Sequence, residues 1–263
     1  MPDVVIDRQG PVAIVTLNRP QKLNAITPEM NELLTEFFHG LYKDDQTRAV
    51  ILTGAGRAFC SGGDVSSLPG SSGVTGPGER RSGRGQYPQL YPPAARRRCD
   101  RPIIAAIDGY AVGGGLGLAL ACDLLIASDQ AKFGAVQIKR GLNADFGLTY
   151  ALPRLVGVQK ALEMMWTGEI IDAHEAQRLR LVLRVVPRDT LMEEAMAMAR
   201  KMADAPPLAV AAIKRALYRF EAGDFEDDLL FSAMAQAGLY MTEDAQEGAR
   251  SFLEKREPRF KGR

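Results

Sequence analysis

Histidine, tryptophan and cysteine are scarce in this chain, which contains two, one and three of them among its 263 residues. The cysteines, Cys60, Cys99 and Cys122, are odd in number and lack the CxxC spacing of metal sites. The pattern therefore indicates neither a disulfide framework nor a zinc site, and we expect no bound metal. Thiols that stay reduced are typical of the cytoplasm, where we expect this protein to work.

Long apolar runs and an excess of one charge sign are also absent. No apolar run reaches the roughly 18 residues that a membrane-spanning helix needs, and residues 1–10 lack the basic start and apolar core of a signal peptide. The formal net charge is +1, so bulk electrostatics favours neither nucleic acid nor a membrane surface. We expect neither as a partner.

Short apolar segments are present, and they alternate with helical patterns. Residues 49–54 (AVILTG), 102–109 (PIIAAIDG) and 123–128 (DLLIAS) are each typical of a short buried strand that ends in a turn. A β-rich run at 12–20 follows a turn, which predicts a hairpin near the N-terminus. Strands that alternate with helices predict an α/β core.

Helix signals appear along the whole chain. Thr27 and Pro28 have the residue types of an N-cap and a first helical position. Asp172 and Thr190 each precede a glutamate by three residues, which is the spacing of a capping box. Arg180 occupies a helix end where a left-handed residue is expected. The last helices are predicted at 190–204, 206–222 and 242–255.

Residues 66–93 differ in composition, since Gly, Ser, Pro and Arg dominate and periodicity is lost. Such a segment predicts a long loop or lid. Its arginines, with Arg96, Arg97 and Arg98 just after it, suit an anionic ligand, but a solvated insertion is an equally good interpretation.

A run of glycines at 113–117 (GGGLG) matches no phosphate-binding or nucleophile motif, because GxxxxGK[ST], GxGxxG and GxSxG all fail here. Glycines at a strand-to-helix turn leave N–H groups exposed at the positive end of the helix dipole, which suits a developing oxyanion. Tight helix–strand packing is the alternative. A second glycine-rich turn at 54–65 favours the oxyanion site, because two turns can each offer one N–H to the same oxygen.

Six segments of the chain, in their order and spacing, resemble the crotonase family of enoyl-CoA hydratases and isomerases. They are NRPQKLNAI, GRAFCSGGDV, IDGYAVGGG, CDLLIAS, AKFGAVQIKRGL and SFLEKREPRFK. The resemblance covers essentially the whole chain and implies an α/β fold, a spiral of ββα units with a helical C-terminal region. On this basis we expect a spiral core with the acyl-CoA site at 1–195, a helical trimerisation region at 196–263, and a homotrimer or dimer of trimers.

The resemblance also implies a substrate that is carried as a coenzyme A thioester, with no other cofactor. By position, the backbone amides of Ser61 and Gly114 would polarise the thioester carbonyl and stabilise an enolate. Other positions match family segments that hold the coenzyme A portion, in some members with the tail supplied by a neighbouring subunit. These positions are Lys22, Ala25, Asp64, Val65, Phe252 and Lys255.

Two positions depart from the hydratases of this family. Those enzymes hold the reacting water between two glutamates, and this chain has Gly117 and Gln137 at the matching positions. Neither residue exchanges a proton near pH 7, whereas water addition needs an acid and a base. Ordinary hydration is therefore not expected.

Asp145 matches a position where several isomerases of the family carry Asp or Glu. Its neighbours Leu142, Phe146 and Leu148 are apolar, and we expect burial among them to make the carboxylate a stronger base. The alternative is that Asp145 merely caps the helix that follows. With both glutamates missing, we favour a catalytic role.

A single carboxylate on one face of a dienolate can take a proton from C2 and return it at C4. The sequence therefore predicts an enoyl-CoA isomerase in which Asp145 is the proton shuttle. Three alternatives stay open: a hydratase with other acid and base residues, Asp145 as a nucleophile as in the family's aryl-CoA dehalogenases, and a non-catalytic acyl-CoA-binding homologue.

Overall fold

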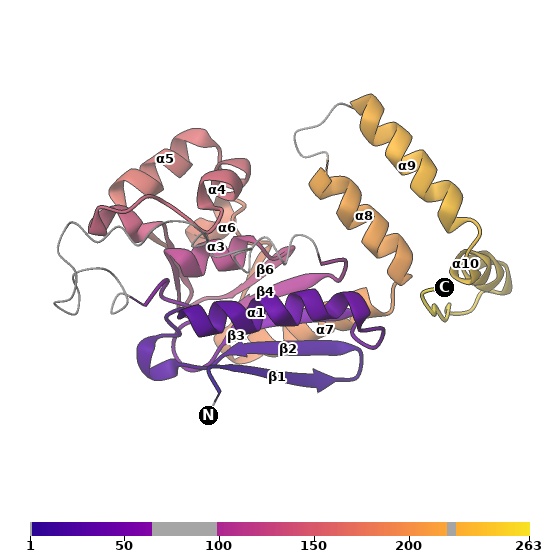
Figure 1. The fold of residues 1–263 in the computed structure, drawn as a ribbon, viewed down its shortest axis with the longest axis horizontal. Coiled ribbons are helices and arrows are strands. Elements are labelled where there is room, and N and C mark those ends of the chain that lie inside the picture. The colour runs from indigo at the N-terminus through magenta and orange to yellow at the C-terminus, as the bar shows by residue number, and fades with distance from the viewer. Residues whose placement is uncertain (1, 65–98, 220–224) are drawn as a thin grey trace, which may run out of the picture.

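The structure is a computed structural model that describes residues 2–64, 99–219 and 225–263 (Figure 1). The predicted loop at 66–93, the arginines at 96–98 and Val65 lie outside the described residues. The rest of the chain forms two sheets, helices that cover them, and a group of helices at the C-terminus.

The main sheet of the described residues has the strand order β1-β2-β3-β4-β6-β9. Its first two strands form the predicted antiparallel hairpin, and the other neighbouring strands pair in parallel. The predicted apolar strands are therefore confirmed, and β9 adds an edge that was not predicted. The strands are β1 (Val4–Gln9), β2 (Val12–Leu17), β3 (Ala49–Gly54), β4 (Ile103–Ile107), β6 (Leu124–Ser128) and β9 (Arg184–Val186).

A smaller sheet with the order β5-β7-β8 is built from the strands β5 (Tyr110–Val112), β7 (Lys132–Gly134) and β8 (Ile170–Asp172). The strands β4 and β5 are consecutive in the chain, and so are β6 and β7. In each pair the first strand belongs to the main sheet and the second to the smaller sheet. Isolated bridges from Ala58 to Gly109 and from Cys60 to Ala111 extend this sheet toward the segment after β3. This repeat of strand, strand and helix is the predicted ββα spiral.

Helices cover both faces of the main sheet (Figure 1). α1 (Pro28–Gly40) begins as predicted, since the Thr27 side chain accepts a hydrogen bond from the Met30 amide. Its buried residues join the larger core cluster, together with strand residues such as Leu52. On the other face, α7 (Leu191–Ala203) packs its small buried side chains against Ile51 and Ile104.

The predicted domain boundary after residue 195 falls inside α7. Ala195, Ala199 and Ala203 lie on one face of this helix and are all buried in the cluster with the main sheet. Because one helix with one buried face belongs to one packing unit, we propose that the helical region starts after Ala203.

Three further helices follow and stand to one side of the sheet layers (Figure 1). Two were predicted, α8 (Pro207–Arg219) and α10 (Glu243–Glu254), while α9 (Phe225–Leu239) was missed. The α9 sequence, FEDDLLFSAMAQAGL, spreads its apolar residues around the helix, so it carries no stripe that periodicity can detect. No helix in the described parts of the chain combines the length and apolar character that a bilayer span requires.

The local helix signals have mixed outcomes. Asp172 caps α6 (Ala173–Arg178), because its side chain accepts from the Glu175 amide, and Arg180 adopts the predicted left-handed conformation with φ of 61°. The capping box at Thr190 is wrong, because its hydroxyl donates to the carbonyl of Pro187 and accepts no hydrogen bond from α7.

Candidate active site

A cavity of about 250 Å³ lies where the two glycine-rich turns meet. Its walls come from the start of α1, the segment after β3, the start of α3 (Gly114–Leu120), the 3₁₀ helix at Val136–Arg140, and the turn before α4 (Leu148–Val156). The residues that line it are Ile26, Thr27, Pro28, Asn31, Ser61, Gly62, Gly63, Asp64, Gly113, Gly114, Val136, Gln137, Arg140, Leu142, Asp145 and Phe146. The two turns that the sequence paired are thus brought together.

Each glycine of the 113–115 run has a different task. Gly113 has a φ of 58°, which favours glycine, and its amide donates to the carbonyl of Gly134. Gly115 lies against the Cys60 backbone so closely that a Cβ would collide with the Cys60 carbonyl. Gly114 opens α3, and its N–H has no acceptor among the described residues. Two glycines of the run therefore serve turning and packing, and the oxyanion role of the Gly114 amide, which lines the cavity, stays a prediction.

The second predicted amide, that of Ser61, is already used. It donates to the carbonyl of Leu23 at 3.0 Å, while the Asp64 amide donates to Ile26 at 2.9 Å. Between them, the Gly63 amide has no acceptor among the described residues. The Ser61 amide therefore already has an acceptor in this chain, and its role at the thioester stays a prediction, whereas Gly63, two residues later, has an N–H without an acceptor among the described residues.

Asp145 lies on the turn before α4 and lines the cavity. Its carboxylate Oδ1 accepts a hydrogen bond from Gln137 Nε2 at 3.1 Å. The N-cap of α4 is Gly147, with no side-chain cap, so Asp145 is not a helix cap. The predicted burial is also wrong, because Asp145 is exposed in the chain and Leu142 is 43% exposed.

Gln137 is the buried partner of Asp145. The residue is 8% exposed, and its Oε1 atom is buried with no hydrogen-bond partner among the described residues. The sequence identified Gln137 by the glutamate that it replaces, but no local pattern indicated that it would contact Asp145. A second lining residue, Asn31, also has a buried side-chain oxygen that has no partner in the part of the chain that the structure describes.

Gly117 faces the turn that carries Asp145. A Cβ added to Gly117 would lie 2.5 Å from Phe146 Cβ and 2.6 Å from its carbonyl oxygen. Phe146 itself has a φ of 52°, and its ring lies beside Gly114. The backbone next to Asp145 thus occupies the space in which a side chain at position 117 would stand.

The residues predicted to hold coenzyme A lie at the edge of the cavity or beyond it. Asp64 lines the cavity, and its carboxylate pairs with Arg19 at 3.1 Å. Arg19 also donates to the carbonyl of Ala25. Ala25 is a buried residue, and Lys22 in the same segment is exposed. Within the described residues, no group of three or more His, Cys, Asp or Glu side chains is arranged to hold a metal ion.

The two tail residues do not reach the cavity within one chain. Phe252 is 82% exposed and Lys255 ends α10 in a left-handed conformation, and neither lines the cavity. α10 lies far from α3 and α4 in Figure 1. A contribution from a neighbouring subunit therefore stays a prediction.

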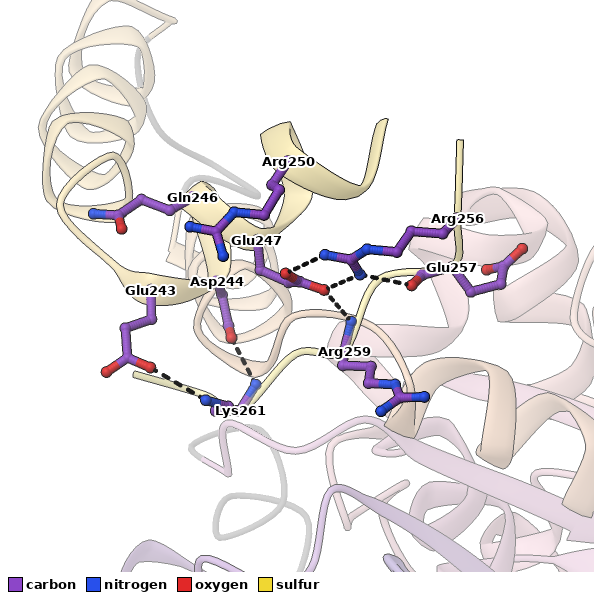
Figure 2. Close-up of a pocket in the computed structure, with 9 residues that line it drawn as sticks. All are labelled: Glu243, Asp244, Gln246, Glu247, Arg250, Arg256, Glu257, Arg259 and Lys261. Carbon is purple, nitrogen blue, oxygen red and sulfur yellow. Dashed lines mark hydrogen bonds and ion pairs between the residues drawn. The ribbon is translucent and has the colours of Figure 1, made fainter. Parts of the chain in front are cut away.

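The tail itself folds back on α10 around a polar cavity of about 780 Å³ (Figure 2). Asp244 accepts the amides of Lys261 and Gly262, and Glu247 pairs with Arg256 and accepts the amide of Arg259. The Arg256 hydrogen bonds lower the pKa of Glu247 to about 2, with help from the Arg259 amide. Asp244 and Glu247 of α10 thus hold the tail in place.

The chain is similar to known proteins along nearly its whole length. A family model for enoyl-CoA hydratase/isomerase matches residues 7–263. The (E)-benzylidenesuccinyl-CoA hydratase of Thauera aromatica is 40% identical over 260 residues, covering 98% of this chain and 99% of that protein. The 2,3-dehydroadipyl-CoA hydratase of Escherichia coli is 35% identical, with complete coverage of both chains. The crystal structure of a putative enoyl-CoA hydratase from Streptomyces coelicolor superposes with a TM-score of 0.92 at 35% identity, covering 100% of this chain and 95% of that one.

Proposed function

Because this chain belongs to the enoyl-CoA hydratase/isomerase family, we propose that it moves the double bond of an enoyl-CoA from the 3,4 to the 2,3 position. The observation that carries the proposal is the position of Asp145. It lines the cavity beside Gly114, and within the described residues its carboxylate forms no ion pair. The other lining carboxylate, Asp64, is paired with Arg19.

The thioester carbonyl is held by two backbone amides, those of Gly114 and Gly63. Both N–H groups lack an acceptor among the described residues, and both residues line the same cavity. When a proton leaves C2, negative charge develops on the thioester oxygen, and fixed N–H donors stabilise that charge. Removing one such donor in other enzymes costs roughly 3–4 kcal/mol of transition-state stabilisation.

Asp145 carries the proton. Its carboxylate takes the proton from C2, and the C–H electron pair becomes part of the dienolate. The protonated carboxyl group then gives the proton to C4, where the new C–H bond forms, and the double bond is left in conjugation with the thioester. One base on one face is sufficient, so the reaction requires no second carboxylate as acid or base.

Hydration is the second candidate, and it is favoured by the relatives, which are named as hydratases. In that case Asp145, whose carboxylate forms no ion pair among the described residues, would activate the reacting water. The space for a second glutamate is closed at Gly117 by Phe146, so a general acid from another group would be required. A non-catalytic role is less favoured, because the Asp145 carboxylate belongs to the cavity wall.

The test is the conversion of a 3-enoyl-CoA to the conjugated 2-enoyl-CoA, followed by the absorbance of the conjugated thioester. Asp145→Asn should abolish this activity and leave acyl-CoA binding intact, because the amide fills the same space but cannot carry the proton. Asp129→Asn, at an exposed turn, is the matched control and should retain activity. Full isomerase activity in Asp145→Asn would refute the assignment, and water addition to a 2-enoyl-CoA without isomerisation would favour the hydratase.

We also propose how the substrate and subunits are arranged. The acyl group is carried as a coenzyme A thioester with no further cofactor, and the coenzyme A portion lies along the segment from Lys22 to Ala25 and past Asp64. Phe252 and Lys255 reach it from a neighbouring subunit of a homotrimer or a dimer of trimers. The buried free cysteines support a reducing, cytoplasmic location.

A further inference from the structure

The Asp145 carboxylate is held by one of its two oxygens. Oδ1 accepts from Gln137 Nε2 at 3.1 Å, and no hydrogen bond or ion pair to Oδ2 is present among the described residues. The charged groups that share the cavity wall are Asp64, which Arg19 neutralises at 3.1 Å, and Arg140. The two carboxylate oxygens are therefore in different environments before any substrate binds.

The donor to Oδ1 is itself held in place. Gln137 is 8% exposed in the 3₁₀ helix at Val136–Arg140, and its backbone carbonyl accepts from the Leu142 amide. The side chain is thus fixed at the base of the turn that carries Asp145, so its amide can act as a stationary donor.

Stability alone does not explain a glutamine at this position. Its Oε1 is buried and has no partner within residues 2–64, 99–219 and 225–263, and burying an unpaired polar group is unfavourable. An apolar side chain such as methionine would fill nearly the same volume without that cost. What methionine lacks is the N–H that contacts Asp145.

We propose that Gln137 is a positioning residue that holds Oδ1 of Asp145 and thereby reserves Oδ2 for the substrate proton. The inference rests on the proposed role of Asp145 and deepens it. Oδ2 accepts the C2 proton as the C–H bond breaks, and its O–H bond breaks again when C4 receives the proton. Throughout, the Nε2–H remains on Gln137, so no proton is gained or lost by the amide.

The first variant is Gln137→Met, which keeps the volume and removes the donor. Because a poorly aimed base costs up to about 100-fold in rate, kcat should fall roughly 10- to 100-fold, while KM for the enoyl-CoA stays within about twofold. Exchange of the C2 proton of a saturated acyl-CoA with deuterated water should fall by the same factor, since it reports proton removal alone. Gln130→Met, at an exposed turn, is the matched control and should leave both rates unchanged.

The second variant is Gln137→Glu, which places a second carboxylate against Oδ1. Two adjoining carboxylates do not both ionise readily, so the acidic limb of the pH profile of kcat/KM should move to higher pH by about one unit or more. Arg140 and the Arg19–Asp64 pair are the other charged groups near this position, and neither changes in the variant. If the role of Gln137 were merely structural, its substitution would lower the amount of folded protein but would not move the acidic limb of the pH profile.

The outcomes separate this inference from the proposed function. If Asp145→Asn is inactive while Gln137→Met keeps the kcat and exchange rate of the unaltered protein, the positioning role is wrong and the proton shuttle stands. If Asp145→Asn keeps the exchange rate, the shuttle itself fails. A crystal structure of Gln137→Met decides independently of activity: an unmoved, equally ordered Asp145 carboxylate would overturn the positioning role.

Discussion

At the scale of single residues, Asn24 links three parts of the backbone around the site. It is fully buried with a φ of 55°. Its Oδ1 accepts from the Arg19 amide at 2.8 Å, and its Nδ2 donates to the carbonyls of Ala55 and Ala58 at 2.9 and 2.7 Å. The side chain thus ties the segment before α1 to the glycine-rich turn after β3.

Replacing Asn24 with Ala should destabilise the protein by about 3 kcal/mol. The change leaves the buried Ala58 carbonyl and two part-buried groups, the Arg19 amide and the Ala55 carbonyl, without their partner. An unsatisfied buried group costs roughly 1–3 kcal/mol, and a part-buried one costs less because water can reach it. Urea unfolding monitored by circular dichroism measures the difference. Asn18→Ala, which loses one exposed bond to the Pro2 carbonyl, should stay within about 0.5 kcal/mol of the unaltered protein. Equal stability of the two variants would contradict the role of Asn24.

Gly117 admits the turn that carries Asp145. Gly117→Ala would place a Cβ 2.5 Å from Phe146 Cβ and 2.6 Å from its carbonyl oxygen, so the turn must shift. Because Asp145 is adjacent to Phe146, we expect kcat for isomerisation to fall roughly 10- to 100-fold. Steady-state kinetics measures the change.

The matched glycine variant is Gly40→Ala at the end of α1. It has no atom within 4 Å of the added Cβ and no left-handed φ, so kcat should be unchanged. An unaltered kcat in Gly117→Ala as well would show that the contact with Phe146 does not position Asp145.

At the scale of elements, α8 is docked on the main sheet by a polar cluster at Asp123. Lys214 of α8 is 9% exposed, and its Nζ contacts Asp123 Oδ2 at 2.7 Å and the Arg101 carbonyl at 2.8 Å. Tyr218 donates to the other carboxylate oxygen at 2.8 Å. Asp123 Oδ2 also accepts the Ile103 amide at 2.7 Å, so this carboxylate joins the main sheet to a helix about 90 residues later in the chain.

Lys214→Met should destabilise the protein by roughly 3 kcal/mol. It leaves Asp123 as a largely buried carboxylate without its cation, and such losses typically cost 3–5 kcal/mol for fully buried pairs. Thermal unfolding measures the effect, with Lys201→Met on the exposed side of α7 as the control. The double variant with Asp123→Asn should lose less stability than the two single variants lose together. A loss equal to that sum would show that the two side chains are not coupled.

The docking of the tail on α10 should depend on pH through Glu247. Its folded-state pKa is about 2, below the usual 4.5, because Arg256 and the Arg259 amide stabilise the carboxylate. A carboxylate with a lowered folded-state pKa contributes stability that is fully present above about pH 4.5. This contribution is lost as the pH falls through about 2. The difference in melting temperature between the unaltered protein and Glu247→Gln should therefore shrink from pH 6 to pH 3. A difference that is constant or grows toward pH 3 would contradict this linkage.

At the scale of the whole molecule, the C-terminal helices leave many large apolar side chains exposed. On α8 these are Ile213 and Leu217, which are 63% and 68% exposed, and Phe252 and Leu253 on α10 are 82% and 80% exposed. Clustered apolar exposure of this kind is typical of surfaces that meet another protein. It supports the proposed assembly of several copies of the chain.

Leu217→Glu should weaken that assembly, because a carboxylate would have to be desolvated at the contact. Light scattering after size-exclusion chromatography is expected to give the mass of a trimer or hexamer for the unaltered protein and a smaller mass for the variant. Leu183→Glu, at a site 51% exposed outside these helices, should keep the larger mass. A monomeric unaltered protein would refute the assembly.

Local structure was determined by the sequence to a large extent. The strands at 49–54 and 103–107, the start of α1 at Thr27 and the left-handed Arg180 all follow from propensity, periodicity and capping, which act over a few residues. The resemblance to the family also pointed to Gly117 and Gln137, because matching residue types at family positions needs no tertiary structure. The helix α9 was not predicted, because its apolar residues form no stripe along one face.

Tertiary structure alone decided which groups at the site are free to act. Ser61 and Gly63 are two residues apart in one glycine-rich turn, and the pairing with Leu23 and Ile26 determines which amide is used and which stays open. In the same way, Asp145 acquires its donor from Gln137, and Gly117 acquires a neighbour in Phe146. Hydrogen-bond availability and free volume depend on what other segments place nearby, so no local pattern encodes them.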